Sequence, residues 1–131
     1  MAAESLAIQI TNGGSRSIVQ LAGELELASA AACREALDGI LHGGRTDILI
    51  DLRGLTFLDS MGLSTLVHAH LVGAERGRRV SFVPGRHSVQ RVFEITEMDA
   101  RVEWADAVER VLLNAAGHVP PKLPHVSGLT A

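Results

Sequence analysis

The chain contains a run of three apolar residues, 48–50, between two longer segments with helical periodicity. A short continuous apolar run is typical of a central strand that is buried on both faces of its sheet. The flanking segments, residues 29–42 and 60–76, repeat apolar side chains at the three- to four-residue spacing of amphipathic helices. The apolar stripes expected to face the sheet are Ala32, Cys33, Ala36, Leu37, Ile40 and Leu41 in the first segment and Leu63, Leu66, Val67, His70, Leu71 and Ala74 in the second. Helices on either side of a buried strand in the chain predict an α/β architecture.

The rest of the chain supplies further strands and helices around this core. Residues 6–11 and 17–27 alternate apolar and polar side chains and are joined by turn-forming residues, which predicts an N-terminal hairpin with Gly23 as a bulge or bend. Ser29 is the predicted N-cap of the helix that follows. Further along the chain we expect a strand at residues 80–83, a short helix at 88–95, an edge strand at 101–104 and a final helix from a capping box at Asp106 and Glu109 to residue 116. The predicted fold class is therefore α/β, with a mixed β-sheet of about four to five strands and about four helices packed against it.

Composition and charge exclude several classes of partner. Aromatic residues make up 3% of the chain and the net charge is −3, so neither a stacking platform nor a basic surface for nucleic acid is expected. The densest basic stretch, Arg76, Arg78 and Arg79, is interpreted as a helix end where cations suit the helix dipole. Cys33 is the single cysteine, which excludes an internal disulfide. No segment resembles a signal peptide or a membrane span, which predicts a cytoplasmic protein with no membrane partner.

Signatures of catalysis are missing from the sequence. It contains no nucleophile elbow, no phosphate-binding loop and no dinucleotide fingerprint. His68 and His70 form an H-x-H pair, but residues two apart on a helix point in different directions. We therefore interpret one as a core residue and the other as a surface residue, and we expect no enzyme activity, no cofactor and no metal site.

The most informative segment is residues 51–63, with the sequence DLRGLTFLDSMGL. Here we expect a buried strand to end, a loop to follow, and Ser60 to lie where the next helix begins. A serine at such a place ordinarily caps its helix through its hydroxyl. Gly62 has no side chain, which is interpreted as leaving the helix start open to close approach by another molecule. Ser60 also begins a polar stripe that continues along the same face with Ser64 and His68.

Residues 51–63 resemble the signature of STAS-domain anti-anti-sigma factors, D-L-x-x-[LV]-x-[FY]-[LM]-D-S-[ST]-G-L. Residues 23–30, with the sequence GELELASA, are similar to the earlier G-E-L-D-x-x-T-A stretch of that family. The resemblance covers residues 6–116, which we expect to form one STAS domain after a short segment at residues 1–5. The Pro-containing residues 117–131 are expected to be a disordered tail.

The resemblance implies that the protein is an anti-sigma factor antagonist. In that family the serine that matches Ser60 is phosphorylated by a partner, an anti-sigma factor serine kinase. The unphosphorylated form binds that partner, and a phosphoserine phosphatase resets the switch. The residues implied to form the partner-binding surface are Glu26, Asp59, Ser60, Met61, Gly62, Ser64 and His68.

Two residues depart from the family pattern. Met61 stands where the family usually has a small residue, and it enlarges the predicted contact surface. Glu26 replaces an aspartate, and it is interpreted either as a partner contact or as a solvated strand residue that shares a face with Glu24. Two other interpretations stay open: a STAS scaffold or subunit that binds a protein constitutively, with Ser60 only capping its helix, and a module that binds a small ligand or nucleotide.

Overall fold

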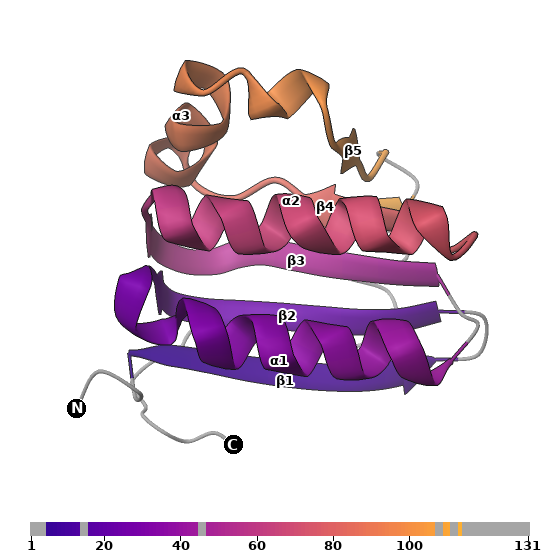
Figure 1. Cartoon of the computed structure of the whole chain (residues 1–131). Coiled ribbons are helices and arrows are strands. Elements are labelled where there is room, and N and C mark those ends of the chain that lie inside the picture. Colours follow the sequence, from indigo (N-terminus) through magenta and orange to yellow (C-terminus); the bar gives the residue numbers. More distant parts are fainter. Residues whose placement is uncertain (1–4, 14–15, 45–46, 107–108, 111–112, 114–131) are drawn as a thin grey trace.

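The computed structural model of the chain describes residues 5–13, 16–44, 47–106, 109–110 and 113 (Figure 1). Its elements in chain order are β1 (Leu6–Gly13), β2 (Arg16–Leu25), α1 (Leu27–Gly43), β3 (Asp47–Leu58), α2 (Ser60–Glu75), β4 (Val80–Val83), α3 (His87–Ile95), the 3-10 helix η2 (Met98–Ala100) and β5 (Glu103–Trp104). Each strand predicted from the sequence is present. The prediction that the central strand ends early and is followed by a loop is wrong, because β3 continues to Leu58 and only Asp59 separates it from α2.

The strands form one mixed sheet in the order β1-β2-β3-β4-β5. β1 and β2 are antiparallel, as the predicted hairpin requires, and every other neighbouring pair is parallel. Gly23 has a φ of 105° and lies where the β2–β3 register shifts, which confirms the predicted bulge. Since β2 and β3 are parallel, their carboxyl ends lie at the same end of the sheet. α1 and α2 both begin at that end.

The central strand is buried on both faces. Ile48 and Ile50 belong to the main core beneath the helices, whereas Leu49 lies in a second cluster on the other face with Ile18 and Val83. This arrangement confirms the prediction made from the apolar run. α1 and α2 lie side by side over the sheet and α3 lies beyond α2, so these three helices cover one face (Figure 1).

The predicted capping box near the end of the described chain is confirmed. The Asp106 N–H donates to Glu109 Oε1 at 3.1 Å, and the Glu109 N–H donates to Asp106 Oδ1 at 2.8 Å. Of the final helix predicted to reach residue 116, residues 109, 110 and 113 are helical, and the rest lies outside the described residues. The described part of the chain therefore has three complete α-helices where about four were expected. The predicted tail at residues 117–131 lies outside the described residues as well.

Some helix positions that face the sheet hold small residues, where the apolar pattern predicted larger ones. On α2, Leu71 is 55% exposed and Ala74 is exposed, whereas Ala69 and Gly73 are buried. A Cβ atom at Gly73 would lie 2.5 Å from a side-chain atom of β4, so the helix approaches the sheet closely at this residue. Leu71 and Ala74 were therefore wrongly placed in the core stripe, and Ala32 on α1 is likewise exposed.

Arg78 caps a neighbouring helix. Its side chain is 5% exposed, and Nη1 donates to the carbonyl oxygens of Ile40 at 2.5 Å and Leu41 at 2.7 Å. These carbonyls belong to the last turn of α1, where a cation also complements the helix dipole. The predicted cation at a helix end is confirmed for Arg78, but the helix is α1 and not the preceding α2.

Candidate functional site

Asp59, and not Ser60, caps the start of α2. Asp59 has an extended backbone, and its Oδ1 accepts the N–H of Gly62 at 2.8 Å. Ser60 is the first residue of the helix and its side chain is exposed. Within the described part of the chain, the Ser60 hydroxyl has no hydrogen-bond partner. The interpretation of Ser60 as the helix cap is therefore wrong, and its hydroxyl is accessible to another molecule.

The same carboxylate joins the starts of two helices. Asp59 Oδ2 accepts the N–H of Leu27, the first residue of α1, at 3.0 Å. Glu26 completes this corner as the N-cap of α1, since its Oε1 accepts the N–H of Ala28 at 2.7 Å. The Glu26 N–H in turn donates to the Ser29 hydroxyl at 3.1 Å, so these residues form a capping box. Ser29 was predicted to be the N-cap, but it is the third residue of the helix.

Gly62 is buried against the protein's own sheet. A Cβ atom built at Gly62 would lie 2.4 Å from the carbonyl oxygen of Leu25 and 2.8 Å from its Cγ. The close approach that the glycine permits is therefore made by the end of β2. The interpretation that the missing side chain opens the helix start to another molecule is wrong, because this side of the helix faces inward.

Three large apolar side chains are exposed on residues that are bonded to Asp59 or lie within two residues of it in the chain. Leu27 is 69% exposed, Phe57 is 51% exposed and Met61 is 48% exposed. Leu27 is bonded through its backbone to Asp59, while the other two are within two residues of Asp59 in the chain. We call this corner the Ser60 surface and define it as Glu26, Leu27, Phe57, Asp59, Ser60 and Met61. Exposed apolar side chains rimmed by polar ones are typical of protein-binding surfaces.

The motif pointed to Met61 but not to Leu27 or Phe57. A strand places successive side chains on opposite faces, so Phe57 must face outward once Leu58 is buried. That alternation was a usable signal for Phe57. Leu27 had been assigned to the end of a strand, although it follows Glu26, a predicted site residue. Its backbone bond to Asp59, 32 residues away in the chain, places it at the start of α2.

The predicted polar stripe continues along α2 toward α1. Ser64 is exposed, and His68 is half-buried between the two helices. Arg34 Nη2 lies 3.3 Å from His68 Nδ1 and 3.2 Å from Nε2, so the guanidinium lies over the imidazole ring. Asp38 Oδ1 lies 3.8 Å from His68 Nε2. His68 thus contacts α1, while Ser64 faces solvent.

Asp51, the first residue of the 51–63 motif, forms an ion pair with Arg53. Asp51 is fully buried, and its Oδ1 accepts the backbone N–H of Arg53 at 3.0 Å and Arg53 Nε at 2.9 Å. Its Oδ2 accepts Arg53 Nη2 at 2.9 Å and Gln20 Nε2 at 3.3 Å. The hydrogen bond to Asp51 raises the pKa of the Arg53 guanidinium. The ion pair lies within β3, the bond from Gln20 joins it to β2, and both lie outside the Ser60 surface.

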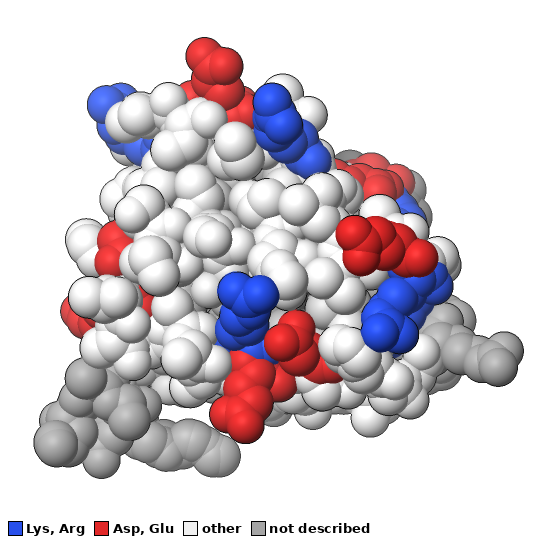
Figure 2. Space-filling view, in the orientation of Figure 1, with Lys and Arg blue, Asp and Glu red and all other residues white. Residues whose placement is uncertain are grey.

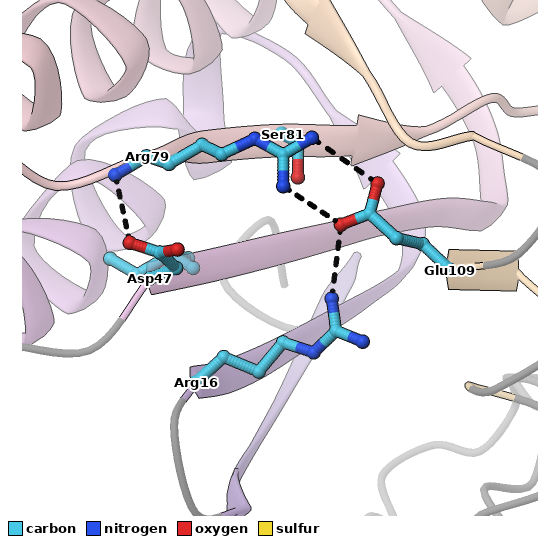
Figure 3. Close-up of a pocket in the computed structure, with 6 residues that line it drawn as sticks. Arg16, Asp47, Arg79, Ser81 and Glu109 are labelled. Atoms are coloured by element: carbon cyan, nitrogen blue, oxygen red, sulfur yellow. Dashed lines mark hydrogen bonds and ion pairs between the residues drawn. The ribbon is translucent and has the colours of Figure 1, made fainter.

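A small polar hollow lies at the other end of the parallel strands (Figure 3). Its volume is about 120 Å³, and Glu109 lies within it between two arginines. Glu109 Oε2 accepts Arg16 Nη1 at 3.1 Å and Arg79 Nη1 at 3.2 Å, while the Arg79 N–H donates to Asp47 Oδ1 at 3.1 Å. Ligand pockets are ordinarily about 300 Å³ or more, so this hollow does not favour the small-ligand interpretation.

The two histidines of the H-x-H pair have separate surroundings. His70 Nδ1 lies 3.2 Å from the carbonyl oxygen of Val80, whereas His68 contacts α1. In the part of the chain that the structure describes, no three or more His, Cys, Asp and Glu side chains are grouped as metal ligands would be. No described helix is long and apolar enough to cross a membrane.

Comparison with known proteins decides the family. A family model described as "Mlab, STAS domain" matches residues 8–117. The chain belongs to the STAS domain family. The predicted family and fold class are thereby confirmed.

This STAS domain is similar to proteins with a common description. It is 31% identical over 91 residues to the anti-sigma-F factor antagonist RsfB of Mycobacterium tuberculosis, a match that covers 69% of this chain and 72% of RsfB. The crystal structure of an anti-sigma factor antagonist from Mycobacterium paratuberculosis has a TM-score of 0.69 at 22% identity, covering 86% of this chain and 95% of that one. The anti-sigma factor antagonist SpoIIAA in its unphosphorylated form has a TM-score of 0.67 at 19% identity, covering 86% and 99%. At such identities the two structures show a common fold.

The STAS domain brings some of the predicted site residues together and separates others. Glu26, Asp59, Ser60 and Met61 meet where α1 and α2 begin, while Gly62 lies beneath them. Ser64 and His68 lie further along α2. Figure 2 shows that most of the surface over the two helices is formed by uncharged residues. Acidic and basic residues are scattered among them.

Proposed function

We propose that this STAS domain is an anti-sigma factor antagonist that binds an anti-sigma factor serine kinase through the Ser60 surface. Phosphorylation of Ser60 by that kinase ends the complex, and a phosphoserine phosphatase restores it. The similarity to RsfB, described as an anti-sigma-F factor antagonist, supports the class of partner. The domain itself needs no catalytic residue, because the kinase supplies the chemistry. Since such a kinase uses ATP, the proposal places the protein in the cytoplasm.

The observation that carries the proposal is the exposed Ser60 hydroxyl at the start of a helix that another residue already caps. Because Asp59 makes the capping bond to Gly62, modification of Ser60 removes no hydrogen bond within the described structure. The first turn of a helix also favours an anion, through its dipole and its free N–H groups. The phosphorylated domain is therefore expected to stay folded.

The phosphate acts on the complex through charge and desolvation. It adds about −1.5 to −2 charges at pH 7. Those charges stand next to the Asp59 carboxylate and among the exposed side chains of Leu27 and Met61, where a docked partner would exclude water. A loss of 2–3 kcal/mol of binding free energy corresponds to an affinity lower by about 30- to 150-fold. A rigid domain can thus be switched without a change of conformation.

Phosphate transfer by the cognate kinase tests the proposed site. The purified domain is incubated with ATP and the anti-sigma factor kinase of the same organism, and the modified peptide is identified by mass spectrometry. We expect one phosphate on Ser60 in the wild type and in Ser88→Ala, a control that removes an exposed serine from the first turn of α3. We expect none in Ser60→Ala. Phosphate on another residue, or unchanged modification of Ser60→Ala, would refute the site.

A constitutive protein subunit is the second candidate. Met61, which follows Ser60, favours this candidate. Its side chain is 48% exposed and offers a larger apolar area for a permanent contact than the small residue that the family usually has there. In that case the partner co-purifies in a stable complex and Ser60 stays unmodified in the native cells across growth conditions. Met61→Ala would then weaken the complex, whereas Ser60→Asp would leave it intact.

A further inference from the structure

The two edges of the sheet differ in how they are protected. β5 forms one edge, contains two residues, and carries Glu103, which pairs with Arg79. β1 forms the other edge, contains eight residues, and has no charged residue and no proline. Proteins ordinarily keep edge strands from pairing by making them short or charged. β5 has both protections and β1 has neither.

The backbone groups that β1 turns outward can be assigned from its pairing with β2. The Glu24 N–H donates to the Ser5 carbonyl oxygen at 2.7 Å, and the β1–β2 register continues without a shift. In an antiparallel pair, residues that bond to the neighbouring strand alternate with residues that do not. Residues 7, 9 and 11 therefore direct their N–H and C=O groups to β2. Those of Leu6, Ile8, Ile10 and Asn12 point to the outer edge, where the described residues place no further strand.

The side chains of the same strand leave apolar surface at this edge. Ile8 lies opposite Leu21 and Ile10 opposite Val19, so both isoleucines are on the core face of the sheet. Ile8 packs against the core, but Ile10 is 42% exposed. A further strand on this edge would continue the core face and cover Ile10.

We propose that the outer edge of β1 pairs antiparallel with β1 of a second copy of this chain. A register with Gln9 opposite Gln9 of the second copy pairs Ile8 with Ile10 and Leu6 with Asn12. This register engages all four outward-facing residues of each strand, since each of them meets another outward-facing residue. An uncharged strand meets no repulsion from its own copy, and a two-fold axis through Gln9 closes the assembly as a dimer. The two sheets then become one continuous sheet.

Charge placed at Gln9 tests the partner and the register together. Gln9 is exposed, and in the proposed dimer two copies of it face each other in a non-hydrogen-bonded pair with Cα atoms about 4.5 Å apart. Like charges at such a pair are destabilising. Sedimentation of the full chain should give twice the 13.9 kDa chain mass for the wild type and the chain mass for Gln9→Lys and Gln9→Glu. An equimolar mixture of the two variants should regain the dimer, and the control Ala32→Lys, on the exposed side of α1, should stay dimeric.

Hydrogen exchange identifies the strand that is covered. The amides of Leu6, Ile8, Ile10 and Asn12 should exchange at least about tenfold faster in Gln9→Lys than in the wild type, while those of residues 7, 9 and 11 should not change. A wild type that stays monomeric at every concentration overturns the proposal. Protection of the outward amides in a monomer would show that the chain's own residues, and not a second copy, cover the edge. A dimer that survives Gln9→Lys would place the interface elsewhere.

Discussion

The carboxylate of Asp59 accepts the backbone N–H of Leu27 at 3.0 Å, across 32 residues of chain. The other oxygen of the same carboxylate caps α2. One side chain therefore fixes the relative position of two helix starts, and with them the exposed apolar side chains around Ser60. This makes Asp59 a structural residue of the site, whatever contact it also makes with a partner.

Asp59→Ala should lower the free energy of unfolding by about 2 kcal/mol, since it removes the cap of α2 and the bond to α1 together. Asp59→Asn keeps one acceptor oxygen and should lose about half as much. Urea unfolding of the three proteins measures the difference. Equal stability of Asp59→Ala and the wild type would mean that the double cap contributes nothing to the fold.

Two glycines in helices should respond to alanine in opposite directions. Gly62→Ala places a Cβ 2.4 Å from the Leu25 carbonyl oxygen, and overpacking of this kind destabilises by about 1–3 kcal/mol. Gly39 on α1 has no atom within 4 Å of such a Cβ, so Gly39→Ala should stabilise by about 0.5–1 kcal/mol. Thermal or urea unfolding compares the pair. A tolerated Gly62→Ala would contradict the close packing of α2 against the end of β2.

The Cys33 thiol should be unreactive in the folded protein. Burial raises its pKa from 9.0 to about 12, because the charged thiolate is poorly solvated in the core. A thiol reagent at pH 8 should therefore modify Cys33 slowly in buffer and rapidly in denaturant. Above pH 9.0 the unfolded thiol ionises while the folded one keeps its proton, so this residue lowers stability as pH rises toward about 12. Rapid modification under native conditions would show that α1 opens readily.

Phe57 should matter for binding and little for folding. It is 51% exposed on the Ser60 surface, so Phe57→Ser removes apolar area that a partner would cover. The affinity for the kinase should fall at least about tenfold, which is 1.4 kcal/mol. Ile95→Ser is the matched control, because Ile95 is 68% exposed at the end of α3, outside the Ser60 surface. Equal affinities of the two variants would exclude Phe57 from the interface.

The architecture followed from the sequence where a pattern was local. The apolar run at residues 48–50 identified the central strand, and β4 and the Asp106 capping box lie where they were predicted. The faces of the helices were less predictable, because close approach to the sheet selects small residues such as Gly73 and leaves Leu71 exposed. Apolar periodicity assigns large apolar residues to the buried face of a helix. It therefore does not identify a buried glycine, at which the helix backbone itself packs against the sheet.

The site was predicted in part. The motif placed Ser60 at the start of a helix, as the structure has it, but the choice of cap between adjacent Asp59 and Ser60 was wrong because both are good N-cap residues. Glu26 was interpreted as a contact or a solvated strand residue, and it is the N-cap of α1. Leu27 was missed because it was assigned to the end of a strand, whereas it is the first residue of α1 and its backbone binds Asp59.

The affinity of the cognate anti-sigma factor kinase for Ser60→Asp, compared with wild type, tests the central claim most directly. Ser88→Asp places the same charge in the first turn of another helix and serves as the control. Calorimetric titration of the three folded proteins should give a Kd for Ser60→Asp that is higher by about 30- to 150-fold, with Ser88→Asp close to wild type. Equal Kd values for Ser60→Asp and wild type would contradict the switch and favour a constitutive subunit.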